Sequence, residues 1–188
     1  MASGELSDEQ TEELTDGRRF RVQAIPVTRV DRTIAVISRR SSESASRTAS
    51  SLENTYLEAA AELVEMIQHG EFPFVGSRSD LAYSLRVGDG LLRTDRQGRV
   101  SYASPNAMSA YRRLGLAGDL VGADLGEVTT GLTDRRPTDH SPLTLLRGNT
   151  DTEAQIENAA AALLLRVIPL RTDGHRNGAL ILLRDVTD

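Results

Sequence analysis

The chain has 188 residues, a formal net charge of −5 and no cysteine, and all 22 of its basic residues are arginine. Disulfides, thiolate chemistry and lysine-dependent reactions such as Schiff-base formation are therefore excluded. The negative charge argues against nucleic-acid binding. The sequence shows no long apolar stretch and no signal peptide, which argues against a membrane and predicts a cytoplasmic protein.

The N-terminal part begins with an acidic stretch, residues 1–19, which we expect to be a flexible lead-in. Strand-like runs at residues 20–28 and 33–38 then predict a β-hairpin. Pro26 cannot donate to a strand ladder, so it requires an edge position or a bulge. The serine-rich stretch at residues 39–51 indicates a loop.

An amphipathic helix is predicted from Ser50 or Ser51 to His69, with Gly70 ending it. Its apolar residues recur at steps of three and four, and we expect this stripe to be buried: Leu52, Tyr56, Ala60, Leu63, Val64 and Ile67. A hairpin and one helix do not close a core. Residues 20–75 therefore form part of a domain, and the polar residues 76–87 form a linker.

The remaining residues, 88–188, predict one α+β domain. Two strands at 90–95 and 99–104 are joined by a turn and followed by a helix at 105–114, which Ser104 caps and Pro105 opens. Short helical or loop pieces around 121–132 and a helix at 142–148 precede strands near 152–157, 161–170 and 178–185. Strands at both ends of a helical middle predict an antiparallel sheet with helices on one face.

The histidines, where acid–base or metal chemistry would first be sought, are His69, His140 and His175. His69 lies at a helix end and His175 in a turn, and none of the three has metal-ligand spacing. Asp139-His140-Ser141 is not a triad, because adjacent side chains do not converge. The sequence has no glycine-rich nucleotide motif either. We expect no catalytic residue, no metal and no evident cofactor in this chain.

Two segments resemble the PAS family of sensor domains: GDGLLRTDRQGRVSYASPNAMSAYRRLG at 88–115, and the closing RDVTD at 184–188. The likeness extends to the PdtaS family of cytosolic actinobacterial sensor histidine kinases. Two earlier segments carry it: FRVQAIPVTRVDRTIAVISR and LENTYLEAAAELVEMIQHGEFPF. The resemblance implies a five-stranded PAS fold over 88–188 and the C-terminal part of a GAF-like domain over 20–75. It also implies a sensory module, with a kinase domain in the same protein and a response regulator as an indirect partner.

A PAS fold offers a small-molecule pocket between its sheet and its helices. The residues expected to line it are Leu92, Tyr102, Met108, Tyr111, Leu146, Val167 and Leu182. The simpler alternative is that these side chains fill the core, and the domain then serves protein interaction or dimerisation without a ligand. The sequence does not encode the identity of a ligand.

Signal transmission is expected at Asp185 and Thr187, because the Asp-x-Thr close of a PAS domain precedes the next helix. Asn106 is interpreted as a structural cap, and Arg112 and Arg113 as a solvated helix face or an anion site. The apolar run at 158–170 is typical of a strand covered on both faces, and it predicts a homodimer.

Overall fold

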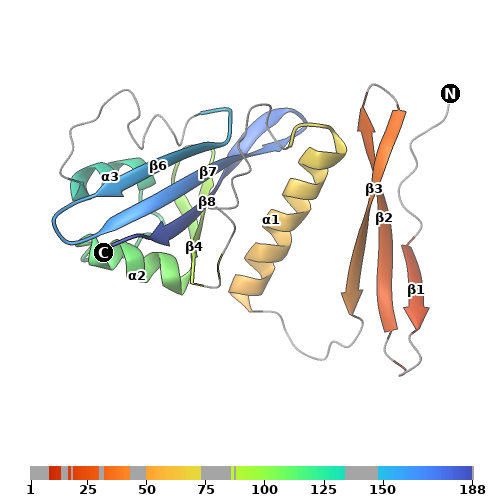
Figure 1. Cartoon of the computed structure of the whole chain (residues 1–188), viewed down its shortest axis with the longest axis horizontal. Helices are drawn as coiled ribbons and strands as arrows, with labels where there is room; N and C mark the ends of the chain where they lie inside the picture. Colours follow the sequence, from red (N-terminus) through yellow and green to blue (C-terminus); the bar gives the residue numbers. More distant parts are fainter. Residues whose placement is uncertain are drawn as a thin grey trace. The chain divides into compact units, whose positions relative to one another are not determined.

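The computed structural model describes residues 9–13, 17, 19–29, 32–42, 50–72, 86, 88–133 and 148–187. The chain divides into two compact units, Met1–Pro73 and Phe74–Asp188. Figure 1 labels most of the elements of the two units, which are described in turn.

The first unit contains a three-stranded antiparallel sheet in the order β1-β2-β3. β2 (Arg19–Arg29) and β3 (Arg32–Ser42) form the predicted hairpin. The expectation that the loop begins at Arg39 was wrong, because β3 continues to Ser42 opposite Phe20 of β2. Alternating exposed polar residues can extend a strand well past its apolar run.

Pro26 lies where the sequence requires it. On one side it pairs with Val36 of β3, and a bulge follows between Val27 and Thr28. On the other side, β1 reaches only as far as Gln23 within the described residues. Among the described residues, Pro26 therefore has a strand neighbour on the β3 side alone, which fits the edge position expected for proline.

The acidic lead-in contributes a strand, β1 (Glu9–Glu13), where a flexible segment was expected. Glutamate is a poor strand former, but β1 runs antiparallel to the arginine-containing β2. Glu12 pairs with Arg40 at 3.1 Å, and Glu13 pairs with Arg19 at 3.4 Å. Cross-strand pairs of opposite charge favour this register, and hydropathy does not report them.

The helix α1 (Ser51–Gln68) begins and ends as predicted. Ser50 is the N-cap, and its hydroxyl accepts a hydrogen bond from the Glu53 amide at 3.2 Å. His69 is the C-cap. At this end the Thr28 hydroxyl donates to the Gln68 carbonyl at 3.2 Å, which ties the helix to β2.

The buried face of α1 differs from the predicted stripe. Thr55, Ala59 and Met66 are buried, whereas Tyr56 is 48% exposed and Ala60 is also exposed. The buried line lies about one residue around the helix from the predicted one. Its small residues carry little hydropathy, so the apolar periodicity indicated the neighbouring line instead.

In the second unit, β4 (Gly90–Asp95) and β5 (Val100–Ala103) form the predicted hairpin. The Asp95 carboxylate closes the turn by accepting hydrogen bonds from the Gln97 and Arg99 amides, both at 2.9 Å. Gly98 takes a φ of +89°, a conformation that favours glycine.

The helix α2 (Pro105–Arg113) follows β5 directly. The Ser104 hydroxyl accepts from the Ala107 amide at 3.3 Å and from the Leu91 amide at 2.9 Å. The predicted N-cap residue Ser104 therefore also links α2 to β4 through its hydroxyl.

The helix α3 (Leu125–Leu132) occupies the predicted helical region, with Asp124 as its N-cap. The Asp124 carboxylate accepts from the Glu127 amide at 3.0 Å. Residues 142–147 of the other predicted helix lie outside the described residues, and Gly148 is not helical.

The last three strands are β6 (Thr152–Glu157), β7 (Ala162–Thr172) and β8 (His175–Asp185). β7 and β8 extend beyond their predicted limits, because Asp173 and Gly174 form a two-residue turn with φ of 51° and 75°. All neighbours in the sheet are antiparallel, in the order β5-β4-β8-β7-β6. The predicted five-stranded antiparallel sheet is confirmed.

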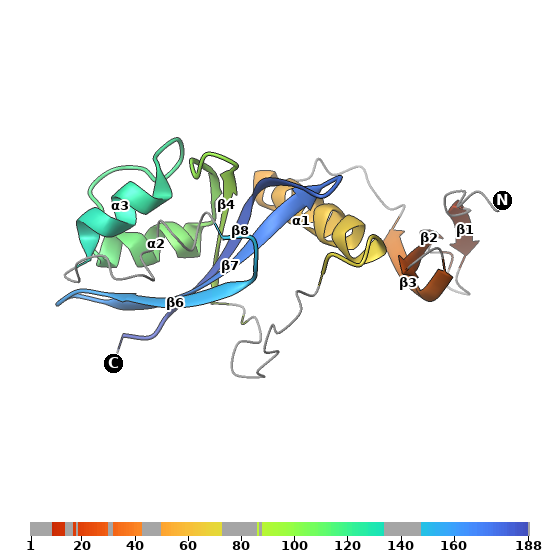
Figure 2. The same cartoon turned by 90° about the horizontal axis from the view of Figure 1, so that it is seen from above.

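The core of the second unit lies between one face of this sheet and the helices. α2 and α3 lie on the same face, as Figures 1 and 2 show. The core side chains come from all five strands and both helices. They include Leu92, Val100, Ala110, Tyr111, Leu125, Ile156, Leu163, Leu165, Val167, Ile181 and Leu183.

Candidate functional site

The core contains several of the predicted pocket residues. Leu92 and Tyr111 are 0% exposed and Val167 is 2% exposed. Met108 is half-buried and packs against the same core. Leu146 lies outside the described residues. These four described side chains belong to the interior, and their role as the lining of a ligand pocket stays a prediction.

Tyr102 and Leu182 do not belong to this interior, so their assignment to the pocket was wrong. Leu92 of β4 faces the core, so the next residue, Arg93, faces away from it. Tyr102 is paired with Arg93, in a register set by a bulge beside Arg93. Leu182 is paired with Leu91 and Arg166 on the outer face of the sheet. Directly paired residues share a face, so both side chains lie on the face opposite the helices.

A buried hydrogen bond joins the two helices that cover the core. The Tyr111 hydroxyl of α2 and the Thr129 hydroxyl of α3 are 2.8 Å apart. Burial raises the pKa of Tyr111 to about 12. The phenol is therefore neutral at ordinary pH, and it satisfies the Thr129 hydroxyl inside the core.

The predicted transmission residues hold the chain where it leaves β8. The Asp185 carboxylate accepts a hydrogen bond from the Thr187 amide at 2.9 Å. The Thr187 hydroxyl accepts from the Ala162 amide at 3.0 Å, and the Val186 amide donates to the Ala162 carbonyl at 2.9 Å. The outgoing segment, residues 185–187, is thus bonded to the start of β7 beyond the end of β8.

Asp185 also contacts α2. Arg113, in the last turn of that helix, lies 2.6 Å from the Asp185 carboxylate. Hydrogen bonding to Thr187 lowers the pKa of Asp185, and the charge of Arg113 lowers it further. Of the two arginines interpreted as a solvated face or an anion site, Arg113 instead has an internal carboxylate partner. Arg112 is exposed.

The chain segment that enters the domain is fixed to the same strand end. Arg184 Nε and Nη2 donate to the two carboxylate oxygens of Asp89 at 2.9 and 2.7 Å. The side chains are only 15% and 9% exposed, and the hydrogen bond from Arg184 is the main reason that the pKa of Asp89 is lowered. Asp89 immediately precedes β4, whose first residue, Gly90, pairs with Leu183 of β8.

Asn158, in the turn between β6 and β7, joins both helix ends to the sheet. Its Nδ2 donates to the Leu114 carbonyl at 2.9 Å and to the Leu132 carbonyl at 2.8 Å. Its Oδ1 accepts from the amides of Ala160 and Ala161 at 2.8 and 3.1 Å. Sequence reasoning missed this residue. The available signal was an asparagine at a strand-to-strand turn, where its side chain can bond the backbone two residues on.

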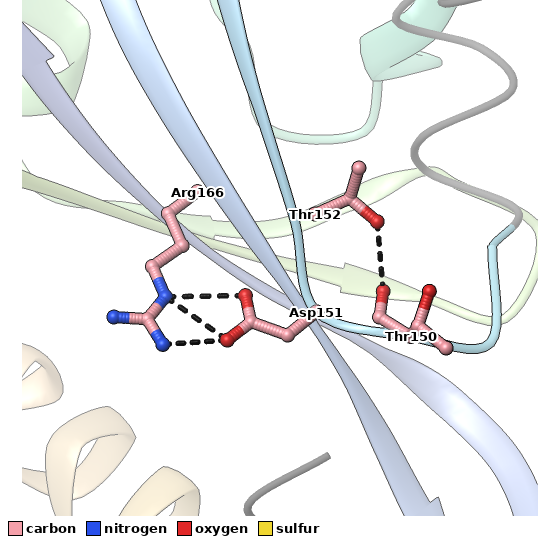
Figure 3. A network of polar contacts seen from close by, with 4 residues as sticks. All are labelled: Thr150, Asp151, Thr152 and Arg166. Atoms are coloured by element: carbon pink, nitrogen blue, oxygen red, sulfur yellow. Dashed lines mark hydrogen bonds and ion pairs between the residues drawn. The ribbon is translucent and has the colours of Figure 1, made fainter. Parts of the chain in front are cut away.

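Three arginines hold the segment that precedes β6 against the sheet. Arg166 makes a bidentate pair with Asp151, with its Nη2 2.5 Å from Oδ2 (Figure 3). Arg171 donates to the Asn149 carbonyl at 2.7 Å, and Arg176 donates to the Gly148 carbonyl at 2.9 Å. Hydrogen bonding to Asp151 raises the pKa of Arg166. The segment at residues 148–151 is therefore held by three side chains, two from β7 and one from β8.

The histidines have no shared site among the described residues. His69 caps α1 and His175 is exposed at the start of β8, while residues 139–141 lie outside the described ranges. No group of three histidine or acidic side chains that could hold a metal ion occurs in the described part of the chain. None of the described helices is long and apolar enough to cross a membrane.

The strand order, the helices on one face and the bonded Asp-x-Thr segment after the last strand define a class of protein. The second unit is a PAS-type sensor domain, as its sequence predicted. The first unit matches a second kind of sensor domain, since the family model for the GAF domain of the histidine kinase PdtaS matches residues 1–60.

The likeness to PdtaS extends along most of the chain. Over 172 residues, 89% of this chain, it is 37% identical to the sensor histidine kinase PdtaS of Mycolicibacterium smegmatis. It is 39% identical over 173 residues to PdtaS of Mycobacterium tuberculosis. A solved structure described as the sensor region of a sensor histidine kinase aligns with 88% of this chain at a TM-score of 0.75 and 38% identity. The predicted resemblance to the sensor region of PdtaS is confirmed.

The chain corresponds to part of these relatives. It spans 34% of the length of both PdtaS proteins, and 64% of the chain in the solved sensor region. The similarity therefore concerns the sensor region.

Proposed function

We propose that this chain is the signal-input region of a two-component sensor histidine kinase. In this proposal a GAF-like part at residues 20–75 and a PAS domain at 88–188 act on a kinase domain outside this chain. The chain itself performs no chemistry. It works in the cytoplasm as a homodimer, and a response regulator receives the phosphoryl group. The similarity to the PdtaS sensor region supports this function.

The observation that carries the proposal is the bonding of the outgoing segment. Asp185 is paired with Arg113 of α2, and Thr187 is bonded to Ala162 of β7. A shift of the helix or of the sheet therefore changes the position of the residues that leave the domain. A ligand or partner shifts this equilibrium only by its difference in affinity for the two arrangements.

The test compares three forms of the intact kinase that contains this region: the full protein, the kinase without the sensor region, and the full protein with Asp185→Ala. We expect the sensor region to change the autophosphorylation rate, and Asp185→Ala to restore the rate of the sensor-deleted kinase. Arg112→Ala is the matched control, because Arg112 is exposed beside Arg113. An Asp185→Ala kinase that keeps the rate of the full protein would refute the transmission role.

A second candidate function is protein interaction or dimerisation without a ligand. It is favoured by the burial of Leu92, Tyr111 and Val167, which are core residues at the predicted pocket. Native mass spectrometry of the purified chain separates the candidates. A dimer without added mass supports the interaction function, whereas a bound small molecule that survives desalting supports ligand sensing.

A further inference from the structure

Two consecutive residues at the end of β8 hold different parts of the domain. Arg184 binds Asp89, in the segment that enters the domain, through two hydrogen bonds of 2.9 and 2.7 Å. Asp185 binds Arg113 of α2 at 2.6 Å. Neighbouring residues of a strand point to opposite faces. The incoming segment is therefore held from the outer face of the sheet, and α2 is held from the core face.

The faces follow from the pairing of β4 with β8. Leu183 belongs to the core and pairs with Gly90, where an added Cβ would lie 2.8 Å from the backbone of Ala107 in α2. Gly90 thus faces the helix, and Asp89 before it faces away. Arg184, after Leu183, also faces away and meets Asp89. Asp185 returns to the helix side and meets Arg113.

We propose that Arg184 and Asp185 form a two-input junction, in which Arg184 positions the outgoing segment according to the incoming segment and Asp185 positions it according to α2. The inference rests on the proposed function. An upstream signal reaches the outgoing segment across one strand pair, without passing through the core. A signal from the core reaches it through α2. Both inputs act on residues 185–187, so each changes the effect of the other.

The pairs are suited to this role because each links a side chain on β8 to a different element. The Asp89–Arg184 pair is nearly buried, and removing one partner of such a pair leaves the other charge uncompensated. The arrangement at Asp89 is therefore strongly coupled to the position of Arg184. The Arg113 side chain is 56% exposed, so that pair exchanges more easily with water.

The experiment measures amide hydrogen exchange in the full 188-residue chain. The amides of Ala162 and Val186 report on the outgoing segment, because they donate to Thr187 Oγ1 and to the Ala162 carbonyl. The variants are Asp89→Asn, Arg113→Gln and their combination. Each single change should accelerate exchange at both amides. The double variant should differ from the product of the single effects by more than about threefold, since distant independent sites are additive to within less than that.

Glu12→Gln combined with Arg113→Gln is the control. Glu12 also has an arginine partner, Arg40, but in the first unit, so the effects of these two changes should multiply independently. Independent effects of Asp89→Asn and Arg113→Gln would overturn the junction, as would equally strong coupling in the control. If Asp89→Asn does not fold, Arg184→Lys replaces it, because lysine keeps the charge and loses the bidentate geometry.

This measurement needs no kinase activity, so it fails independently of the proposed function. Coupled exchange together with an unresponsive Asp185→Ala kinase would retain the junction and refute the signalling role. Independent exchange effects together with a responsive kinase would refute the junction and retain the signalling role.

Discussion

Replacing Asn158 by alanine should destabilise the second unit, because this side chain makes four hydrogen bonds between a turn and two helix ends. The side chain donates to the carbonyls of Leu114 and Leu132, at the ends of α2 and α3. It also accepts two amide bonds within its own turn. Asn158→Ala removes all four bonds and leaves both helix ends without their hydrogen bonds to the β6–β7 turn.

The expected loss follows from the number and setting of these bonds. A typical hydrogen bond contributes about 0.5–1.5 kcal/mol net. Asn158 is half-buried, so water replaces part of what is lost. We expect a decrease of about 2–3 kcal/mol in the free energy of unfolding of the second unit. This equals about 30- to 150-fold faster exchange of its slowest amides.

The assay is amide hydrogen exchange of β7 and β8 under native conditions, because the slowest amides report unfolding of the whole unit. Asn177→Ala is the control, since Asn177 is exposed on β8. It should change the free energy by no more than about 0.5 kcal/mol. Asn158→Asp keeps the acceptor and loses both donors, so it should lose most of the same stability. If Asn158→Ala and Asn158→Asp both behaved like Asn177→Ala, the tie would be unimportant and the reasoning refuted.

Three further changes test other parts of the second unit. Gly90→Ala should destabilise it by about 1–3 kcal/mol in urea unfolding, because the new Cβ would lie 2.8 Å from the α2 backbone. Gly88→Ala is its control, having no atom within 4 Å. The pKa values of Asp89 and Asp185 are lowered by folding. Their contribution to the free energy of unfolding is therefore complete above about pH 4 and is lost as pH falls through the folded pKa values. Asp89→Asn should reduce this loss of stability at acid pH when the free energy of unfolding is measured against pH. The pKa of Tyr111 is raised to about 12 in the folded unit, so its contribution to stability is complete below about pH 10 and is lost as pH rises toward 12. Tyr111→Phe should remove this loss of stability at alkaline pH.

Each of these expectations has a contrary result. Equal urea midpoints for Gly90→Ala and Gly88→Ala would show that α2 does not approach β4 closely. An acid limb unchanged by Asp89→Asn would show that the pair with Arg184 does not contribute to pH dependence. An alkaline limb that persists in Tyr111→Phe would assign it to other groups.

Local chemistry in the sequence was sufficient for the elements of the second unit. Ser104 and Pro105 start α2 where they must, and the turn at Gly98 joins β4 to β5. These signals are short-range, because each cap or turn residue bonds the backbone within a few positions. The limits of β4, β5 and α2 therefore followed closely from the residues themselves.

The prediction of which sheet face a side chain occupies failed at two places, where the alternation of apolar and polar residues was absent or was shifted by a bulge. The run from Ala179 to Leu183 is apolar throughout, so alternation could not tell Leu182 from its core-facing neighbours. At Tyr102 the bulge opposite Arg93 moved the side chain to the other face.

The polar network at the outgoing segment could not be derived from sequence. Asp89 and Arg184 are 95 residues apart, and Asn158 is 44 residues from Leu114. Many of the 22 arginines could have served as partners. The pairing of β4 with β8 brings Asp89 to Arg184, and the packing of α2 on the sheet brings the Leu114 carbonyl to Asn158.

The arginine pairs also decide how this protein can be labelled. The ion pairs of Asp89, Asp151 and Asp185 described above are each made with a guanidinium group, and the sequence contains no ε-amino group. Amine-reactive dyes and cross-linkers would therefore leave all three contacts chemically intact. Dicarbonyl reagents, which modify guanidinium groups, would reach the half-exposed Arg113 before the nearly buried Arg184. Graded modification with such a reagent would disconnect α2 from the outgoing segment while the incoming segment stayed attached.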